Sequence, residues 1–133
     1  MSQENVEVVR RQNEAFNRGG DGWLEFYDPG AEVHIPPGGF EDHDLIYTGH
    51  EGIKRAAALW TENVSEYRWD LVKLIDAGDS VVGLYRFRSR MTESGAWLEP
   101  PLGAIFDLRD GKIVRLLTYF SWDEALKAAG LEE

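Results

Sequence analysis

Apolar side chains recur every three or four positions in the first part of the chain, as they do on the buried side of an amphipathic helix. Val6, Val9 and Phe16 follow this spacing, and Gly19-Gly20 supplies a helix stop. Later segments, one of them with Ile53 and Trp60 on its apolar side, have the same character. The predicted helices cover residues 3–18, a short segment between Asp21 and Pro29, residues 49–64 and residues 122–129.

From residue 67 onward, stretches of strand character are separated by turn signals at Ala77-Gly78, Ser94-Gly95 and Asp110-Gly111. Helices followed by an antiparallel meander indicate an α+β fold with helices against one face of a curved sheet. The chain has 133 residues and shows no repeat or linker, so one domain spanning residues 1–133 is predicted. The predicted strands cover residues 31–35, 67–76, 79–92, 96–108 and 112–120.

Turn chemistry predicts which residues share a face of the sheet. A two-residue loop at Ser94-Gly95 places Tyr85 opposite Ala104 and Arg90 opposite Glu99. For the next hairpin, a three-residue loop with Gly111 in the left-handed conformation is preferred, because a two-residue loop turns an arginine onto the apolar face. The resulting apolar face fits either a closed core or space for a ligand. It carries Gly83, Tyr85, Phe87, Ser89, Met91, Leu98, Pro100, Leu102, Ala104, Phe106, Val114, Leu116, Thr118 and Phe120.

Composition narrows the classes of function. A formal net charge of -10 repels nucleic-acid phosphates and anionic lipid surfaces, so neither nucleic acid nor membrane is an expected partner. The chain has no cysteine, which excludes disulfides and thiolate chemistry. The N-terminus lacks an apolar signal core, and the longest apolar run, residues 56–60, is too short to span a bilayer. A cytoplasmic location is therefore expected.

Six segments resemble the SnoaL-like proteins, a branch of the nuclear transport factor 2-like superfamily that includes relatives of ketosteroid isomerases and polyketide cyclases. The resemblance covers essentially the whole chain. It implies a cone-like, curved antiparallel sheet wrapped around N-terminal helices, the cystatin-like α+β arrangement. The segments are Val6-Glu-Val-Val-Arg-Arg with Ala15-Phe-Asn-Arg, Phe26-Tyr-Asp-Pro with Glu32-Val, Tyr47-Thr-Gly-His-Glu-Gly-Ile, Ile75-Asp-Ala-Gly-Asp, Leu108-Arg-Asp-Gly-Lys-Ile-Val-Arg and Glu124-Ala-Leu-Lys-Ala-Ala-Gly-Leu.

The resemblance also implies a homodimer that packs the outer sheet faces together. Trp97, Ile105 and Tyr119 fall on the outer face in the predicted register, which fits a partner surface. The alternative is that these side chains lie against the terminal segments of their own chain.

The catalytic residues of the ketosteroid isomerases, which share this fold, have no equivalents in this chain. Matching the ketosteroid isomerases by flanking residues places their three functional positions at Gln12, Ile35 and Ala104, and none of these has the required chemistry. A different acid/base pair is conceivable. If Ala77-Gly78 is a two-residue loop, Asp70 lies opposite Tyr85, and a buried carboxylate beside a phenol is a candidate catalytic pair. The alternative is a structural hydrogen bond.

The segment from Pro36 to Thr48 follows the first strand, where this fold opens its cavity, so it is a candidate lid. A surface loop or a dimer contact is the alternative. His43 lies there between Asp42 and Asp44, His34 is expected to point outward, and His50 is near a helix start. Because these spacings match no metal motif, no metal site is predicted. The apolar side chains of the lid are Phe40, Leu45, Ile46 and Tyr47.

Two functions therefore remain. The preferred one is a protein that binds a small, hydrophobic metabolite in an apolar pocket, without a cofactor. The alternative is an enzyme of cyclase, isomerase or dehydratase type that uses Asp70 and Tyr85. A third option is an interaction module with a filled cavity. The expected pocket residues are Gln12, Trp23, Tyr27, Ile35, Trp60, Phe87, Ala104, Phe106 and Phe120.

Overall fold

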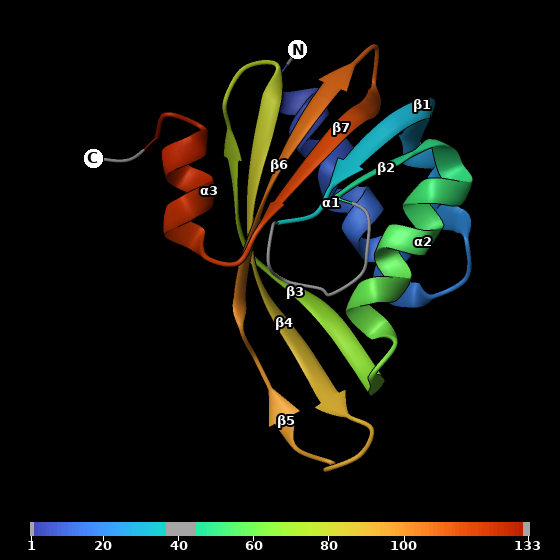
Figure 1. The fold of residues 1–133 in the computed structure, drawn as a ribbon. Helices are drawn as coiled ribbons and strands as arrows, with labels where there is room; N and C mark the ends of the chain where they lie inside the picture. Colours follow the sequence, from blue (N-terminus) through green and yellow to red (C-terminus); the bar gives the residue numbers. More distant parts are fainter. Residues whose placement is uncertain (1, 37–44, 132–133) are drawn as a thin grey trace.

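A computed structural model describes residues 2–36 and 45–131 of the chain. Within these ranges it has three α-helices, one 3₁₀ helix and seven strands (Figure 1). The helices are α1 (Ser2–Arg18), η1 (Gly22–Phe26), α2 (Gly49–Thr61) and α3 (Trp122–Ala128). The strands are β1 (Tyr27–His34), β2 (Ile46–Thr48), β3 (Val64–Asp76), β4 (Ser80–Met91), β5 (Trp97–Leu98), β6 (Pro101–Arg109) and β7 (Lys112–Tyr119).

All seven strands form one sheet, in the order β2-β1-β7-β6-β4-β3, with β5 paired to β4. Neighbouring strands are antiparallel except β1 and β7, which run parallel. Helices α1 and α2 lie on one side of the curved sheet and α3 lies on the other (Figure 1). The predicted α+β class and the curved sheet around N-terminal helices are therefore confirmed, with the parallel β1–β7 pair as an added feature.

The predicted N-terminal helix is confirmed as α1, which ends where Gly19 and Gly20 adopt positive φ. The region after it differs from the prediction. The short helix η1 ends at Phe26, and the strand begins at Tyr27 instead of Ala31. The strand starts early because its backbone is irregular between Tyr27 and Glu32, a bulge that absorbs the Pro29-Gly30 pair.

The hairpin between β3 and β4 differs from the prediction in two ways. The amide of Ala77 donates to the carbonyl of Ser80 (2.9 Å), so the loop residues are Gly78 and Asp79 and not Ala77-Gly78. The register also shifts between Leu71 and Lys73. A bulge adds one unpaired residue and so reverses which residues face the helices.

In the hairpin that leads from β4 to β6, the predicted faces are right and the predicted pairs are wrong. Met91 donates to the carbonyl of Ala96 (2.8 Å), so four residues form the loop. Every pair moves by two positions: Tyr85 lies opposite Leu102 and Gly83 opposite Ala104. Because side chains alternate with a period of two, this shift keeps each residue on its predicted face.

The charged side of the same hairpin changes accordingly. Arg90 pairs with Trp97 and not with Glu99, and its guanidinium contacts Glu66 (3.3 Å). Glu99 lies 3.6 Å from Arg88 instead.

The loop between β6 and β7 has two residues, and the prediction of a three-residue loop was wrong. Asp110 and Gly111 both have positive φ (53° and 78°), as a two-residue type I′ turn requires. An irregularity between Asp107 and Leu108 then restores the face, so that Leu116 and Thr118 lie on the helix side as predicted. Two further side chains differ from the prediction: Ile113 is fully buried in place of Val114, and Phe120 is partly exposed.

The outer face of the sheet is covered in part by α3. Val82, Leu84 and Ile105 are buried there, packed against Trp122 and Leu126 of this helix. Ile105 therefore packs with a terminal segment of its own chain, which was the alternative considered above, and Tyr119 packs against the same cluster. Trp97 lies on β5 and is 50% exposed. No helix in the described ranges is long and apolar enough to cross a membrane.

Candidate functional site

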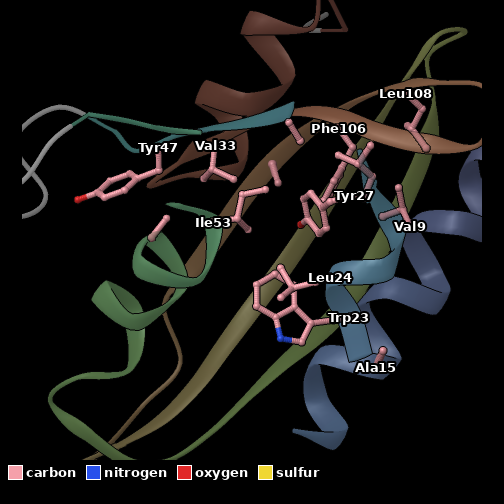
Figure 2. Packing of buried hydrophobic residues seen from close by; sticks show 14 of the residues in the cluster. Val9, Ala15, Trp23, Leu24, Tyr27, Val33, Tyr47, Ile53, Phe106 and Leu108 are labelled. Carbon is pink, nitrogen blue, oxygen red and sulfur yellow. The ribbon is translucent and has the colours of Figure 1, made fainter. Parts of the chain in front are cut away.

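A cavity of about 90 Å³ lies between α1, α2 and the inner face of the sheet. Strands β4, β6 and β7 form its floor, because their alternating inward residues border it. Figure 2 shows Trp23 and Tyr27 in the space between α1 and Ile53 of α2. All three of these residues line the cavity. The segments that meet here are far apart in sequence, so the fold itself creates the space.

Aromatic rings form a large part of the cavity wall. The ring centroids of Trp60 and Trp69 are 5.6 Å apart, at an interplanar angle of 76°. Tyr85 meets Trp69 edge-on at 5.9 Å, and Trp23 meets Tyr27 edge-on at 5.8 Å. Edge-to-face contacts of this kind hold large rings at defined angles, which gives the wall a fixed shape.

Two of the polar side chains in the wall already have hydrogen-bond partners. The hydroxyl of Thr118 donates to the carbonyl of His34 (2.7 Å), and the amide of Asn13 donates to the carbonyl of Trp69 (3.3 Å). The side chains of Gln12, Tyr27 and Tyr85 also line the cavity but make no hydrogen bond to another described residue. Among the described lining residues there is no Asp, Glu, His, Lys or Arg.

Burial controls the protonation of the two phenols. It raises the pKa of Tyr27 and of Tyr85 well above the ordinary value near 10, and the nearby Tyr85 raises the pKa of Tyr27 further. Both hydroxyl groups therefore keep their protons at neutral pH. They act as neutral hydrogen-bond donors and are poor groups for moving a proton.

A glycine determines where Tyr85 lies. A Cβ atom at Gly83 would lie 2.5 Å from Cε1 of Tyr85 and 2.7 Å from its hydroxyl oxygen. The Tyr85 ring thus lies along its own strand, over the position where a side chain is missing. Gly83 provides the close approach that only a residue without Cβ permits.

Trp69 is a cavity residue that the sequence reasoning missed. Asn17 of α1 holds it by two hydrogen bonds, one donated to the Trp69 carbonyl and one accepted from its amide, both 2.9 Å. The Trp69 ring stacks on Phe87 with centroids 4.3 Å apart, and its indole N–H is buried without a partner in the described structure. The predicted register of β3 would have turned this ring to the outer face.

Six of the nine predicted pocket residues line the cavity: Gln12, Trp23, Tyr27, Trp60, Ala104 and Phe106. Tyr85 lines it as well. Ile35 does not, since it is buried in the adjacent core. Phe87 and Phe120 line a neighbouring hollow that shares Trp60 and Leu102 with the cavity.

The expected Asp70–Tyr85 pair is wrong. The bulge between Leu71 and Lys73 and the shifted loop place Asp70 opposite Arg86 and leave Leu71 opposite Tyr85. Asp70 accepts a hydrogen bond from Nε of Arg68 (2.7 Å) and does not line the cavity. An acid/base pair of these two residues does not form.

The candidate lid is only partly described. Phe40, Asp42, His43 and Asp44 lie outside the described residues. At the end of the segment, Leu45 and Ile46 are exposed.

Tyr47 is buried in the core on β2, opposite Val33. It therefore is not an apolar side chain of a lid.

The remaining histidines have local partners. His34 contacts Glu32 at 3.0 Å, and Nε2 of His50 lies 3.0 Å from the carbonyl of Tyr27. In the described part of the chain, no three His, Asp or Glu side chains gather as metal ligands would.

Comparisons with known proteins agree with this architecture. TerC, crystallised with polyporic acid, is 24% identical, with 93% of this chain and 98% of that chain covered and a TM-score of 0.78. A nuclear transport factor 2-like protein of unknown function from Burkholderia pseudomallei is 20% identical, with 93% and 95% covered and a TM-score of 0.78. A protein from Jannaschia sp. that is proposed to be a SnoaL-like polyketide cyclase is 20% identical. The alignment covers 98% of this chain and 94% of that chain, with a TM-score of 0.74.

At these identities the solved structures show a shared fold. A comparison with curated proteins gives no match. The family model described as SnoaL-like domain matches residues 9–116, which include α1 from Val9 onward, η1, α2 and every described strand except the end of β7. The chain therefore belongs to the SnoaL-like domain family.

Proposed function

We propose that this protein binds a small, uncharged and largely apolar molecule in the cavity between α1, α2 and the sheet. The observation that carries the proposal is the lining itself, which is aromatic and aliphatic and has no charged side chain among its described residues. Apolar pockets with a few convergent polar groups are the usual form of a small-molecule site. A lining without charges disfavours both carboxylate and phosphate ligands.

The volume supports a compact ligand. A buried water needs roughly 10–15 Å³ of such space, so 90 Å³ exceeds what one or two waters require. An apolar cavity of about 150 Å³ takes up benzene. The cavity is smaller than that, so a ligand of about one ring must extend into the neighbouring hollow beside Trp60.

Binding is favoured over the enzymatic alternative. A general acid or base works best with a pKa near the operating pH. The pKa values of Tyr27 and Tyr85 are both raised, and Asp70 lies away from the cavity. The match to structures of cyclase-like proteins supports the fold and family, and the cavity walls support a binding role.

Native mass spectrometry of the purified protein tests the proposal. We expect a retained small molecule in the parent protein and its loss in Ala104→Leu, because the added atoms enter the cavity. Ala128→Leu on the exposed side of α3 is the matched control and should keep the molecule. If the parent carries no adduct, and cyclohexanone added in excess forms none, the binding function is contradicted.

We also propose a homodimer through the outer face of β3, β4 and β5. Trp97 is 50% exposed there. The face carries both charge signs, with Arg88 between Asp70 (3.9 Å) and Glu99 (3.6 Å), so these charges are balanced within one chain.

Sedimentation velocity should show a dimer that Trp97→Ser weakens. Leu131→Ser, an exposed residue after α3, is the control and should leave the dimer intact. A monomeric parent protein at micromolar concentration would contradict the dimer. A cytoplasmic location remains a prediction from the sequence.

A further inference from the structure

Besides Trp69 with its unpartnered indole N–H, three buried polar side chains face the cavity without a partner among the described residues. Gln12, Tyr27 and Tyr85 are only 7%, 3% and 4% exposed, yet their side chains bond to no other described residue. Buried polar groups in folded proteins nearly always have a hydrogen-bond partner. Nearby Asn13 and Thr118 follow this rule, since both donate to backbone carbonyls. The side chains of Gln12, Tyr27 and Tyr85 thus differ from those of Asn13 and Thr118 in the same cavity wall.

The three groups come from separate elements that the core holds in place. Gln12 is on α1, Tyr27 is at the start of β1, and Tyr85 is on β4. Trp23 and Trp69 pack edge-on against the two phenol rings, and the missing side chain at Gly83 fixes the position of Tyr85. Rotation of either phenol to find a partner elsewhere is blocked by this packing.

Each phenol must place its hydroxyl hydrogen on an acceptor. A donor without a partner is a rarer and more costly deficiency in proteins than an acceptor with a spare lone pair. A carbonyl oxygen has two lone pairs and can accept from two donors at once. The described lining residues include no cation to balance an anionic ligand, so the matching acceptor is uncharged.

We propose that the ligand of this cavity carries an uncharged carbonyl oxygen, as in a cyclic ketone or a lactone, and that Tyr27 and Tyr85 donate hydrogen bonds to it. Gln12 is the third polar contact and orients the polar end of the ligand. The inference rests on the proposed binding function and adds the chemical class that the site selects.

Two probes of nearly equal shape test this selection. Cyclohexanone carries a carbonyl oxygen where methylenecyclohexane carries a CH₂ group. Dissociation constants are measured by NMR titration of the parent protein, Tyr27→Phe, Tyr85→Phe and the control Tyr47→Phe. Tyr47 is a buried tyrosine that does not line the cavity. Each phenylalanine keeps the ring and removes only the hydroxyl.

We expect the parent to bind cyclohexanone more tightly than methylenecyclohexane. Tyr27→Phe and Tyr85→Phe should each weaken cyclohexanone binding by about 2- to 12-fold, the range of one net hydrogen bond, and leave methylenecyclohexane binding unchanged. Their melting temperatures should not fall, since in the free protein the two hydroxyls bond to no other described residue. Tyr47→Phe should bind both probes as the parent does.

Each contrary result overturns a distinct statement. Equal binding of the two probes, unaffected by the phenylalanine variants, contradicts the carbonyl class and leaves the binding function standing. Tighter binding of tetramethylammonium than of cyclohexanone also contradicts it, because the rings would then recognise a cation. Failure of all three probes to bind contradicts the binding function itself.

Discussion

Replacing Gly83 by alanine should close the cavity with little change in the free energy of unfolding. The new Cβ would lie 2.5 Å from Cε1, 2.7 Å from the hydroxyl oxygen and 2.9 Å from Cζ of Tyr85. Since carbon atoms normally approach to about 3.5–4.0 Å, the ring must retreat by roughly 1 Å. Trp69 blocks one direction, and the cavity is the open one. Tyr85 should therefore swing into the space that the ligand needs.

The expected magnitudes follow from this movement. An off-rotamer side chain costs about 0.5–1.5 kcal/mol. Alanine in a strand recovers about 0.5–1 kcal/mol relative to glycine. The free energy of unfolding, measured by urea denaturation, should thus change by less than about 1 kcal/mol. Cyclohexanone binding, measured by NMR titration, should fall at least roughly tenfold, the effect of about 1.4 kcal/mol of lost contact.

Gly103→Ala is the matched control: the backbone of Gly103 borders the cavity, but the added Cβ would point to the opposite side of the sheet, toward α3. There the Cβ would lie 2.6 Å from Cβ of Ala125 and 3.1 Å from the carbonyl oxygen of Ser121. Because Ser121 caps α3 and Ala125 is buried within it, overpacking should destabilise the protein by about 1–3 kcal/mol. Cyclohexanone binding should stay within about twofold. Unchanged binding in Gly83→Ala would refute the reasoning, as would lost binding in a folded Gly103→Ala.

Three further predictions follow from the site. Above about pH 10 the unfolded chain ionises its tyrosines, while the raised pKa values keep Tyr27 and Tyr85 protonated in the folded protein. The stability from each phenol is thus present below pH 10 and is lost above it by about 1.4 kcal/mol per pH unit. Tyr85→Phe should reduce this alkaline slope in urea denaturation, and an unchanged slope would contradict its burial. Asn17→Ala removes both hydrogen bonds to the Trp69 backbone and should lower the free energy of unfolding by about 1–3 kcal/mol. A smaller loss would show that α1 is held by packing alone. Asp70→Asn should change stability by less than about 1 kcal/mol and leave cyclohexanone binding intact, because Asp70 lies in a surface ion pair. A strong loss of binding would reopen its role at the site.

The alternation of apolar residues predicted the faces of the sheet better than its pairs. A shift of two positions between β4 and β6 leaves Tyr85 and Ala104 on the inner face, so the cavity wall could be predicted although the register was wrong. A bulge shifts the pattern by one position instead. The bulge between Leu71 and Lys73 moved Asp70 outward and brought Trp69 inward, which explains both the wrong catalytic pair and the missed cavity residue.

The presence of a cavity inside the fold, unlike the faces of the sheet, could not be predicted from the sequence. Whether an apolar face is filled or hollow depends on how side chains from distant segments meet, and no local pattern contains that information. Ile35 illustrates this, because it lies in the predicted strand and is buried, yet packs into the core beside the cavity. Ala104 has the same kind of position and borders open space.

The five tryptophans provide the most direct test of a cavity that binds a small uncharged molecule. Trp23, Trp60 and Trp69 line the cavity, while Trp97 and Trp122 lie on the other side of the sheet. Titration with cyclohexanone, followed by the indole N–H signals in a ¹H–¹⁵N NMR spectrum, should shift the first three signals in a saturable manner and leave the other two in place. Shifts confined to Trp97 and Trp122, or no saturable shift at any tryptophan, would contradict the account.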